Sequence, residues 1–288
     1  MKHAFKQRVM VTGGKGQLGK DVVELVKQAG YEVFPVDREE MDITNFDRCH
    51  EVMHNIKPHI VIHTAAYTEV DAAEGDHEGA FLINAYGTRN VAVVAEQLRA
   101  RLVYISTDYV FSGQGKQPRN EFHTVSPINV YGASKLAGES FVKELHSQYF
   151  IVRTSWVYGQ HGKNFVKTML SLAMQHKEVS VVDDQIGCPT YTVDLATTII
   201  ELIKTSKYGI YHVSNSGFCS WHEFASAIFE LTKSDTLANP VSTKQFPRPA
   251  ARPSYSVFDH MSLRLNGFQT PRPWKEALAE FLSRLPSN

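Results

Sequence analysis

The N-terminal part of the chain places a strand, a glycine-rich turn, a helix and a second strand in direct succession. Arg8–Thr12 is a short apolar run that predicts a buried strand, and glycines 13, 16 and 19 follow it at once. A helical pattern then runs to Ala29, and residues 32–36 predict the next strand. Glycine permits the tight turn and lets the helix pack closely on the strand. This order predicts a β-α-β unit with a parallel sheet.

The glycine-rich turn also suits a phosphate-bearing ligand. The predicted helix begins at Gln17, followed by Leu18. Its N-terminus offers unpaired N–H groups and the positive end of the helix dipole. Asp37 ends the second strand about 20 residues after the glycines, where an acid can bind ribose hydroxyls. The neighbouring Arg38 suits a 2′-phosphate. We therefore predict a nicotinamide dinucleotide site that accepts both NADH and NADPH, with NADPH favoured.

The rest of the chain continues the alternation of strand and helix. This pattern predicts an α/β fold, a Rossmann-like doubly wound parallel sheet with right-handed crossovers. Later apolar runs predict two further strands at 179–182 and 209–213, with a helix near 193–204. The predicted strands of the first half are 8–12, 32–36, 59–63, 102–106 and 149–153, and the helices are 17–29, 46–56, 78–98 and 131–146.

The last part of the chain, from Phe218, changes to helical patterns joined by proline-rich loops. We interpret it as a smaller, mostly helical C-terminal substrate domain. The predicted division gives residues 1–160 and 179–215 to the dinucleotide-binding domain, and residues 161–178 and 216–288 to the substrate domain.

Composition excludes several classes of function. The 288 residues carry equal numbers of acidic and basic side chains, so nothing favours a nucleic-acid or membrane partner. The longest apolar runs are too short to span a membrane. The three cysteines form no paired framework and predict reduced thiols in a cytoplasmic protein. No histidine has metal-ligand spacing, so we predict no metal site.

Tyr131 and Lys135 are four residues apart in a predicted helix, so they share one face of it. A cation beside a phenol lowers its pKa from the usual value of about 10, and such a tyrosine can exchange a proton with a substrate oxygen. Thr107, 24 residues before Tyr131, can donate a second hydrogen bond to that oxygen. These three residues are the predicted catalytic group, although an isolated Tyr-x-x-x-Lys pattern is also typical of a solvated helix face.

Further segments strengthen this interpretation in combination. The segments typical of a broad group of enzymes are Gly13–Gly19, Asn84–Thr88, Thr107 and the Tyr131/Lys135 pair. The segments typical of one family within that group are 106–111, 153–159, 164–170, 184–190 and 252–256. With these segments the chain resembles the extended short-chain dehydrogenases/reductases over nearly its whole length. Among them it is most similar to the dTDP-4-dehydrorhamnose reductase family.

The resemblance implies NAD(P)H-dependent reduction of the 4-keto group of dTDP-4-dehydro-L-rhamnose to give dTDP-L-rhamnose, a precursor of bacterial surface polysaccharide. Tyr131 would be the proton donor, and Lys135 would bind the nicotinamide ribose and tune Tyr131. Thr107 would polarise the keto oxygen. The nicotinamide cofactor would supply the hydride.

The resemblance also implies binding roles. The adenosine end of the cofactor would be surrounded by Asp37, Arg38, Asp42 and Ile43, and the middle of the cofactor by Ala65, Ala66 and Tyr67. The dTDP-sugar would be bound by Thr107, Asp108, Tyr109, Trp156 and Arg252. Some relatives form a Mg²⁺-bridged dimer, but the scattered acids here give no support for that metal. A homodimer remains open.

Two alternatives stay open at the level of sequence. One is another nucleotide-sugar enzyme of the same group, a 4-epimerase or a 4,6-dehydratase, which retains its cofactor through turnover. Dehydratases usually place acids directly after the catalytic threonine, whereas here Asp108 is followed by Tyr109. The other is a non-catalytic module like the regulatory subunit of methionine adenosyltransferase, which has no need of a complete catalytic group.

Overall fold

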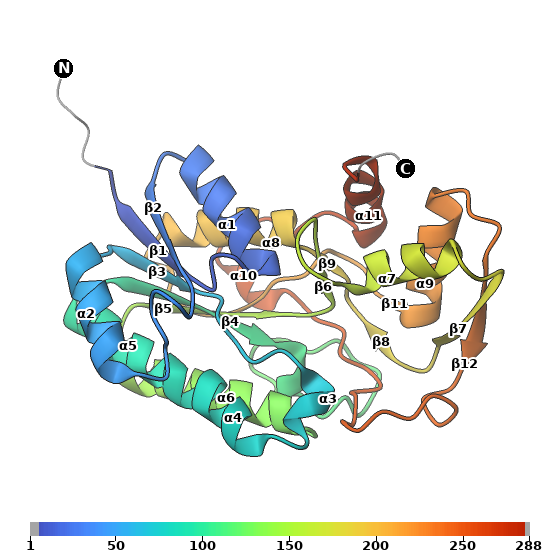
Figure 1. Cartoon of the computed structure of the whole chain (residues 1–288), viewed down its shortest axis with the longest axis horizontal. Coiled ribbons are helices and arrows are strands. Elements are labelled where there is room, and N and C mark those ends of the chain that lie inside the picture. Colours follow the sequence, from blue (N-terminus) through green and yellow to red (C-terminus); the bar gives the residue numbers. More distant parts are fainter. Residues whose placement is uncertain (1–5, 286–288) are drawn as a thin grey trace.

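The computed structural model describes residues 6–285 and has a six-stranded parallel sheet at its centre (Figure 1). The strand order β10-β5-β4-β3-β1-β2 runs outward in both directions from β1 and β3, as expected of a doubly wound sheet. The strands are β1 (Arg8–Thr12), β2 (Glu32–Val36), β3 (Ile60–His63), β4 (Arg101–Thr107), β5 (Tyr149–Thr154) and β10 (Gly209–His212).

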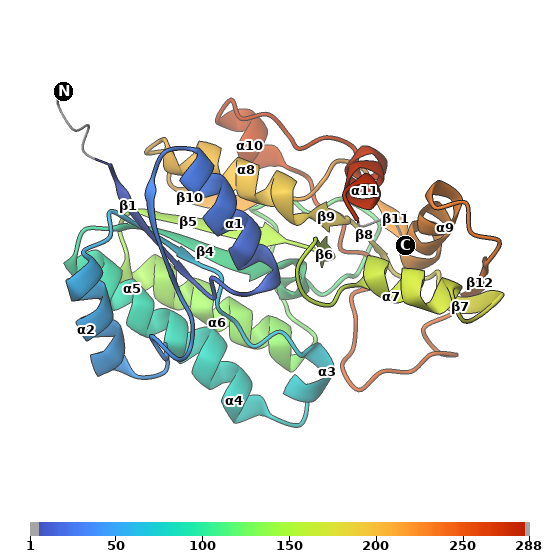
Figure 2. The same cartoon turned by 45° about the horizontal axis from the view of Figure 1, so that its top comes forward.

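Helices cover both faces of this sheet because successive strand residues point to opposite sides. Val9 and Val11 pack on one face under α1 (Gln17–Gln28) and α8 (Thr192–Ile203). Met10, between them, faces the other side. There it lies under three helices that Figure 2 shows on that face, namely α2 (Phe46–Ile56), α5 (Thr88–Gln97) and α6 (Val130–Leu145).

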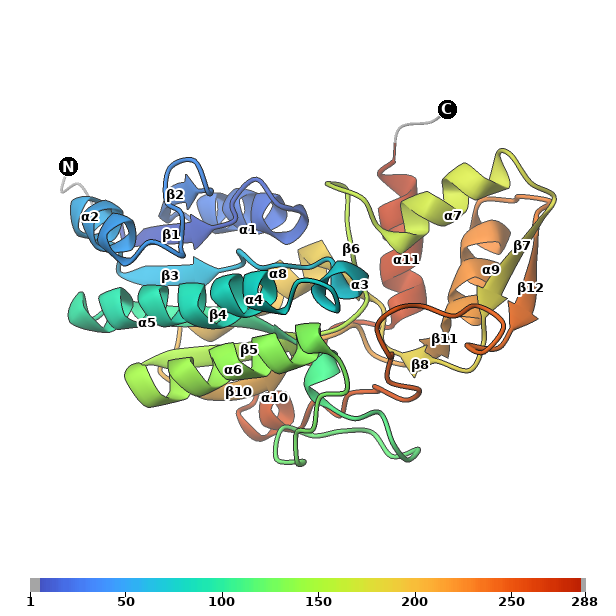
Figure 3. The ribbon, with the colours of Figure 1, turned by 60° about the horizontal axis from the view of Figure 1, so that its bottom comes forward.

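A smaller lobe lies beyond the carboxyl ends of β4 and β5 (Figure 3). Its own apolar core contains aromatic side chains such as Tyr158, Phe224 and Phe281. Its elements are β6 (Val157–Tyr158), α7 (Phe165–Ala173), β7 (Glu178–Val182), β8 (Ile186–Gly187), β9 (Thr190–Tyr191), β11 (Cys219–Ser220), α9 (Trp221–Leu231), β12 (Leu237–Val241) and α11 (Trp274–Ser283). One further helix, α10 (Met261–Leu265), packs near β10.

The predicted α/β class and parallel sheet are confirmed, with two local differences. The predicted helix 78–98 is three consecutive pieces, α4 (His77–Phe81), a π-helical turn (Leu82–Gly87) and α5. The predicted strand 179–182 forms as β7 but pairs in parallel with β12, outside the six-stranded sheet. The division into domains stays a prediction, and this pairing favours placing 178–182 with the smaller lobe.

Two short helical segments complete the fold near the carboxyl edge of the sheet. They are α3 (Val70–Ala73) and a 3₁₀ turn (Asp108–Val110) directly after β4. Within the described part of the chain, none of the helices combines the length and apolar character that a bilayer crossing requires.

Gly138 sets how closely α6 approaches its neighbours. A Cβ added there would lie 2.4 Å from both the Asn84 carbonyl oxygen and the Tyr104 hydroxyl. We expect Gly138→Ala to force α6 outward and lower the free energy of unfolding by about 1–3 kcal/mol, despite the better helix propensity of alanine. Urea denaturation measures this change. Gly75→Ala is the matched control, because its nearest contact is 3.7 Å away; equal stability of the two variants would contradict the packing argument.

Candidate active site

A cavity of about 610 Å³ lies at the carboxyl edge of the sheet. The loops after β1, β3, β4 and β5 form its walls, and Trp221 of the smaller lobe closes one side. Most of the residues predicted for the site line it together: Gly13, Gly16, Gln17, Leu18, Gly19, Asp37, Ala65, Ala66, Thr107, Asp108, Tyr109, Tyr131, Lys135 and Trp156.

The glycine turn has the form that close approach of a pyrophosphate requires. Gly13 has a φ of +65°, and a Cβ on Gly19 would lie 2.0 Å from the Gly13 carbonyl oxygen. Helix α1 starts after Gly16 with no side-chain cap and no acidic residue in its first turn. Its first N–H groups and its dipole therefore face the cavity without a competing carboxylate, which fits a dinucleotide phosphate.

Asp37 closes one end of the cavity, and its carboxylate accepts a hydrogen bond from the Lys15 backbone N–H at 3.0 Å. The other predicted adenosine contacts do not line the cavity. Arg38 is largely exposed and pairs with Asp42 at 3.3 Å. Ile43 is buried against Gly87. Arg38 thus lies next to Asp37 on the protein surface, held by an exposed ion pair that contributes little to stability.

Thr107 ends β4 and caps the short 3₁₀ turn that follows. Its hydroxyl accepts from the Tyr109 N–H at 3.2 Å and donates to the Asp108 carboxylate at 3.1 Å. Burial raises the pKa of Asp108 to about 6. The turn therefore presents Thr107, Asp108 and Tyr109 to the cavity as one rigid unit.

Tyr131 and Lys135 face the same cavity from α6, as their spacing predicts. The expected lowering of the Tyr131 pKa by Lys135 is wrong in this structure. Burial and the nearby Asp108 carboxylate raise the pKa of Tyr131 to about 12, although a hydrogen bond with Thr107 acts in the opposite sense. Burial also lowers the pKa of Lys135 to about 7, so its positive charge is itself weakened. The phenol is held in its protonated form.

Lys135 is positioned by groups that sequence reasoning missed. Its ammonium lies 4.2 Å from the centre of the Tyr104 ring. One turn further along α6, Glu139 is fully buried and its charge raises the pKa of Lys135, opposing the effect of burial. The Glu139 carboxylate pairs with Arg153 at 2.7 Å and accepts from the Ser106 hydroxyl at 2.6 Å. The 131/135/139 spacing is the sequence signal that could have found Glu139.

Asn84 joins the loop after β3 to α6. Its side chain accepts from the Tyr67 N–H at 2.8 Å and donates to the Tyr67 carbonyl at 3.1 Å and to the Ser134 hydroxyl at 2.9 Å. The Tyr67 ring packs in a small apolar cluster with Tyr131 and does not line the cavity. Tyr67 therefore supports Tyr131, whereas Ala65 and Ala66 form the cavity wall.

A second cavity of about 450 Å³ adjoins the first and shares Tyr109 and Trp221 with it. Trp221 stacks on Trp156 with ring centres 3.5 Å apart and planes at 8°. Arg252 lines the second cavity, and its guanidinium donates to the Asp71 carboxylate. The predicted substrate residues thus lie in two connected spaces. Within residues 6–285, no group of three His, Cys, Asp or Glu side chains is placed to hold a metal ion.

A doubly wound sheet with a glycine turn after β1 and a Tyr-x-x-x-Lys helix facing the same cavity defines the extended short-chain dehydrogenase/reductase class. The model of one family, the RmlD substrate binding domain, matches residues 7–287. The chain belongs to this family.

Named relatives agree with that assignment. The chain is 44% identical to the spore coat polysaccharide biosynthesis protein SpsK of Bacillus subtilis, over 97% of this chain and 98% of that protein. It is 38% identical to a dTDP-4-dehydrorhamnose reductase of Aggregatibacter actinomycetemcomitans, over 94% and 97%. The crystal structure of a dTDP-4-dehydrorhamnose reductase from Bacillus anthracis in complex with NADP superposes with a TM-score of 0.96 at 53% identity, covering 98% of this chain and 100% of that one.

The Glu139 carboxylate generates a testable pH dependence. Glu139→Gln removes the negative charge that raises the pKa of Lys135, so the lysine should lose its proton at lower pH. We expect the alkaline limb of the kcat/KM profile, which reports groups of the free enzyme, to move to lower pH. The variant leaves Arg153 buried without its carboxylate and should lose roughly 3–5 kcal/mol of stability.

If Glu139→Gln unfolds, the pH profile is measured on the double variant Glu139→Gln with Arg153→Met, which also removes the buried arginine charge. Glu144→Gln is the matched control, because Glu144 lies on the same helix and is exposed. A pH profile of Glu139→Gln that coincides with that of Glu144→Gln would show that Glu139 serves stability alone.

Proposed function

We propose that this protein is a dTDP-4-dehydrorhamnose reductase that uses NADPH, and also NADH, to reduce the 4-keto group of dTDP-4-dehydro-L-rhamnose to dTDP-L-rhamnose. The observation that carries this proposal is that Thr107, Tyr131 and Lys135 line one cavity together with the uncapped start of α1. The names of the relatives and the NADP complex support the same substrate class and cofactor.

The protein's own residues divide the reaction between them. Bound NADPH would supply the hydride to C4 of the sugar. Thr107 would donate a hydrogen bond to the O4 oxygen, and Tyr131 would transfer its phenolic proton to that oxygen as the negative charge develops there. A phenol whose pKa is raised to about 12 is protonated at neutral pH, as a proton donor must be. Lys135 would hold the nicotinamide ribose hydroxyls.

The second cavity is the proposed place of the nucleotide half of the substrate. Its apolar walls include Phe165, Trp221 and Phe246, and two guanidinium groups, Arg248 and Arg252, reach it. Aromatic faces suit a base and a guanidinium fork suits a diphosphate. Because Tyr109 and Trp221 line both cavities, a sugar joined to that diphosphate would extend toward Tyr131.

One assay separates this proposal from its alternatives. The purified full chain is supplied with the dTDP-4-keto-6-deoxysugar and NADPH, and the absorbance of the reduced cofactor is followed. We expect stoichiometric oxidation of NADPH. NAD⁺ that stays tightly bound through purification, with no oxidation of added NADPH, would favour an epimerase or dehydratase. The absence of turnover with intact substrate binding and no retained cofactor would favour a regulatory module.

Tyr131→Phe tests the chemical step. The substitution keeps the ring and removes only the phenolic hydroxyl, so substrate binding should survive. We expect kcat to fall by about 10²–10⁴, the usual contribution of a positioned general acid, with little change in KM. Steady-state kinetics measure both constants. Tyr86→Phe is the control because Tyr86 is exposed and lies outside the cavity. A Tyr131→Phe enzyme with near-normal kcat would remove Tyr131 from the proposed role.

Arg38→Ala tests the cofactor preference. Arg38 lies beside Asp37 at the adenosine end of the proposed site and is exposed enough to turn toward a 2′-phosphate. We expect KM for NADPH to rise roughly tenfold, about 1.4 kcal/mol of lost binding, and KM for NADH to change little. Arg48→Ala, another exposed arginine paired with an acid, is the control. Equal changes for both cofactors would assign Arg38 no part in recognising the phosphate.

A further inference from the structure

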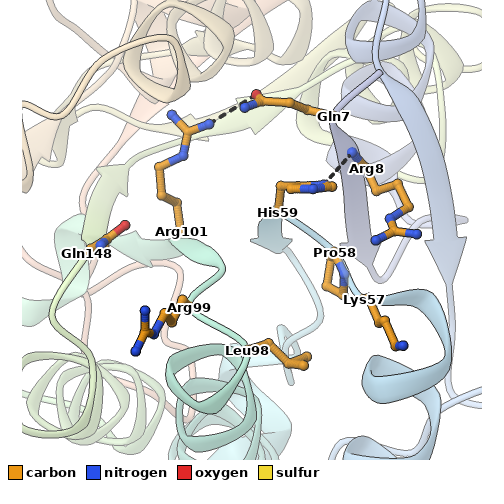
Figure 4. Close-up of a pocket in the computed structure, with 9 residues that line it drawn as sticks. All are labelled: Gln7, Arg8, Lys57, Pro58, His59, Leu98, Arg99, Arg101 and Gln148. Carbon is orange, nitrogen blue, oxygen red and sulfur yellow. Dashed lines mark hydrogen bonds between the residues drawn. The ribbon is translucent and has the colours of Figure 1, made fainter. Parts of the chain in front are cut away.

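A separate recess, of about 430 Å³, lies at the amino edge of the six-stranded sheet, opposite the proposed active site. Its lining comes from the segments that precede or begin four adjacent strands: 7–8 at β1, 57–59 before β3, 98–101 at β4 and 148 before β5. Figure 4 shows these side chains around the recess. Parallel strands bring such segments together at one edge, as they do for the active site at the other.

The recess is strongly positive. The described residues that line it include Arg8, Lys57, Arg99 and Arg101 and no carboxylate. Among residues 6–285, none of these four cations has a carboxylate within salt-bridge distance. The chain as a whole carries no formal net charge, so these like charges are concentrated locally. A bound anion would relieve their mutual repulsion.

Arg101 is held in place by hydrogen bonds, whereas the Arg8 guanidinium has a donor left unsatisfied within the described part of the chain. Arg101 donates to the Gln7 side chain at 3.1 Å and to the Ile203 carbonyl. The Nε of Arg8 is buried and has no hydrogen-bond partner among the described residues. His59 lies between the two arginines in Figure 4, and burial together with their charges lowers its pKa. Both guanidinium charges therefore act on the His59 ring, so their positive potential extends into the recess.

The other two cations occupy unusual backbone positions. Lys57 and Arg99 follow the ends of α2 and α5 with φ of 49° and 54°, a left-handed conformation that favours glycine. A non-glycine residue there costs about 1–2 kcal/mol. Attraction to the helix dipole accounts for a positive charge at a helix end. It does not account for Arg8 and Arg101, which stand at the starts of strands.

We propose that this recess binds an anion that carries two or more phosphate groups. One phosphate group carries up to about two negative charges at pH 7, so four cations match about two such groups. Guanidinium forks bind phosphate oxygens in pairs, and Leu98 and Pro58 add an apolar surface beside the charges. The proposal does not depend on the function proposed for the opposite edge of the sheet.

Isothermal titration calorimetry of the full chain with inorganic pyrophosphate, at low ionic strength, tests this site. NADP⁺ and dTDP are left out, because each carries a diphosphate that the recess would itself bind. We expect one pyrophosphate per chain to bind at the recess, recognised as the binding that variants of the recess lose, and at least tenfold weaker binding of orthophosphate. Equal affinities for the two ions, or no binding of pyrophosphate, would overturn the proposal.

The double variant Lys57→Gly with Arg99→Gly removes two charges and suits the left-handed backbone, so it should fold at least as well as the parent. We expect it to bind pyrophosphate at least tenfold more weakly. Lys233→Gly is the matched control, because Lys233 is also an exposed lysine with positive φ after a helix, α9, and does not line the recess. Equal loss of affinity in the control would show general charge attraction and overturn the site.

A second variant and a second probe complete the test. Arg8→Met should weaken pyrophosphate binding in the same way, while both recess variants keep the kcat and KM of the parent for NADPH. ADP in place of pyrophosphate has the same number of phosphate groups and distinguishes their source. Tighter binding of ADP would show that the apolar side of the recess takes the organic part of a nucleotide. Equal binding would show that the phosphates alone are recognised.

Discussion

The buried carboxylate of Glu139 is the interaction on which the arrangement of the candidate active site depends. It joins α6 to Ser106 at the end of β4 and to Arg153 at the end of β5. Those residues directly precede Thr107 and the segment that carries Trp156. A buried ion pair of this kind contributes little net stability compared with apolar packing, but it tolerates only one geometry. The carboxylate therefore fixes the distance between Tyr131 and Lys135 on the helix and the groups that face them from the sheet.

Parallel strands separate the molecule into two chemically different edges. At the carboxyl edge the backbone supplies N–H groups and glycine turns, and side chains such as Thr107 and Tyr131 supply hydroxyl groups. Charged side chains of both signs, among them Asp108 and Lys135, line the same cavity. At the amino edge the recess is lined by cations, among them Arg8 and Arg101, that make no salt bridge with a carboxylate in the part of the chain that the structure describes. The same crossover topology that assembles one site from distant segments also assembles the other, and the sheet core between them is apolar.

The sequence predicted most of what local patterns control. The strands at 8–12 and 32–36 form with those bounds, and the glycine turn and the Tyr131/Lys135 pair meet at one cavity. The pairing of strands far apart in the chain could not be predicted from the sequence. The apolar run 179–182 looks like any strand of the main sheet, and only its partner, β12, decides where it lies. The burial of Glu139 could not be predicted for the same reason, because it depends on contacts with Arg153 and Ser106.

The pKa of Tyr131 shows why a sequence motif alone does not predict the pKa values of its own residues. The four-residue spacing places Lys135 on the same face, but the spacing carries no information on burial. Burial favours the neutral forms of both groups, raising the pKa of the phenol and lowering that of the ammonium, and Asp108 adds a further negative charge. A protonated phenol beside a weakly charged lysine is suited to giving a proton to an oxygen that becomes negative during the reaction. The raised pKa keeps the Tyr131 phenol protonated at neutral pH, which the proposed role of proton donor requires. It also makes the phenol a weaker acid, so proton transfer in the proposed reaction depends on the negative charge that develops on the substrate oxygen.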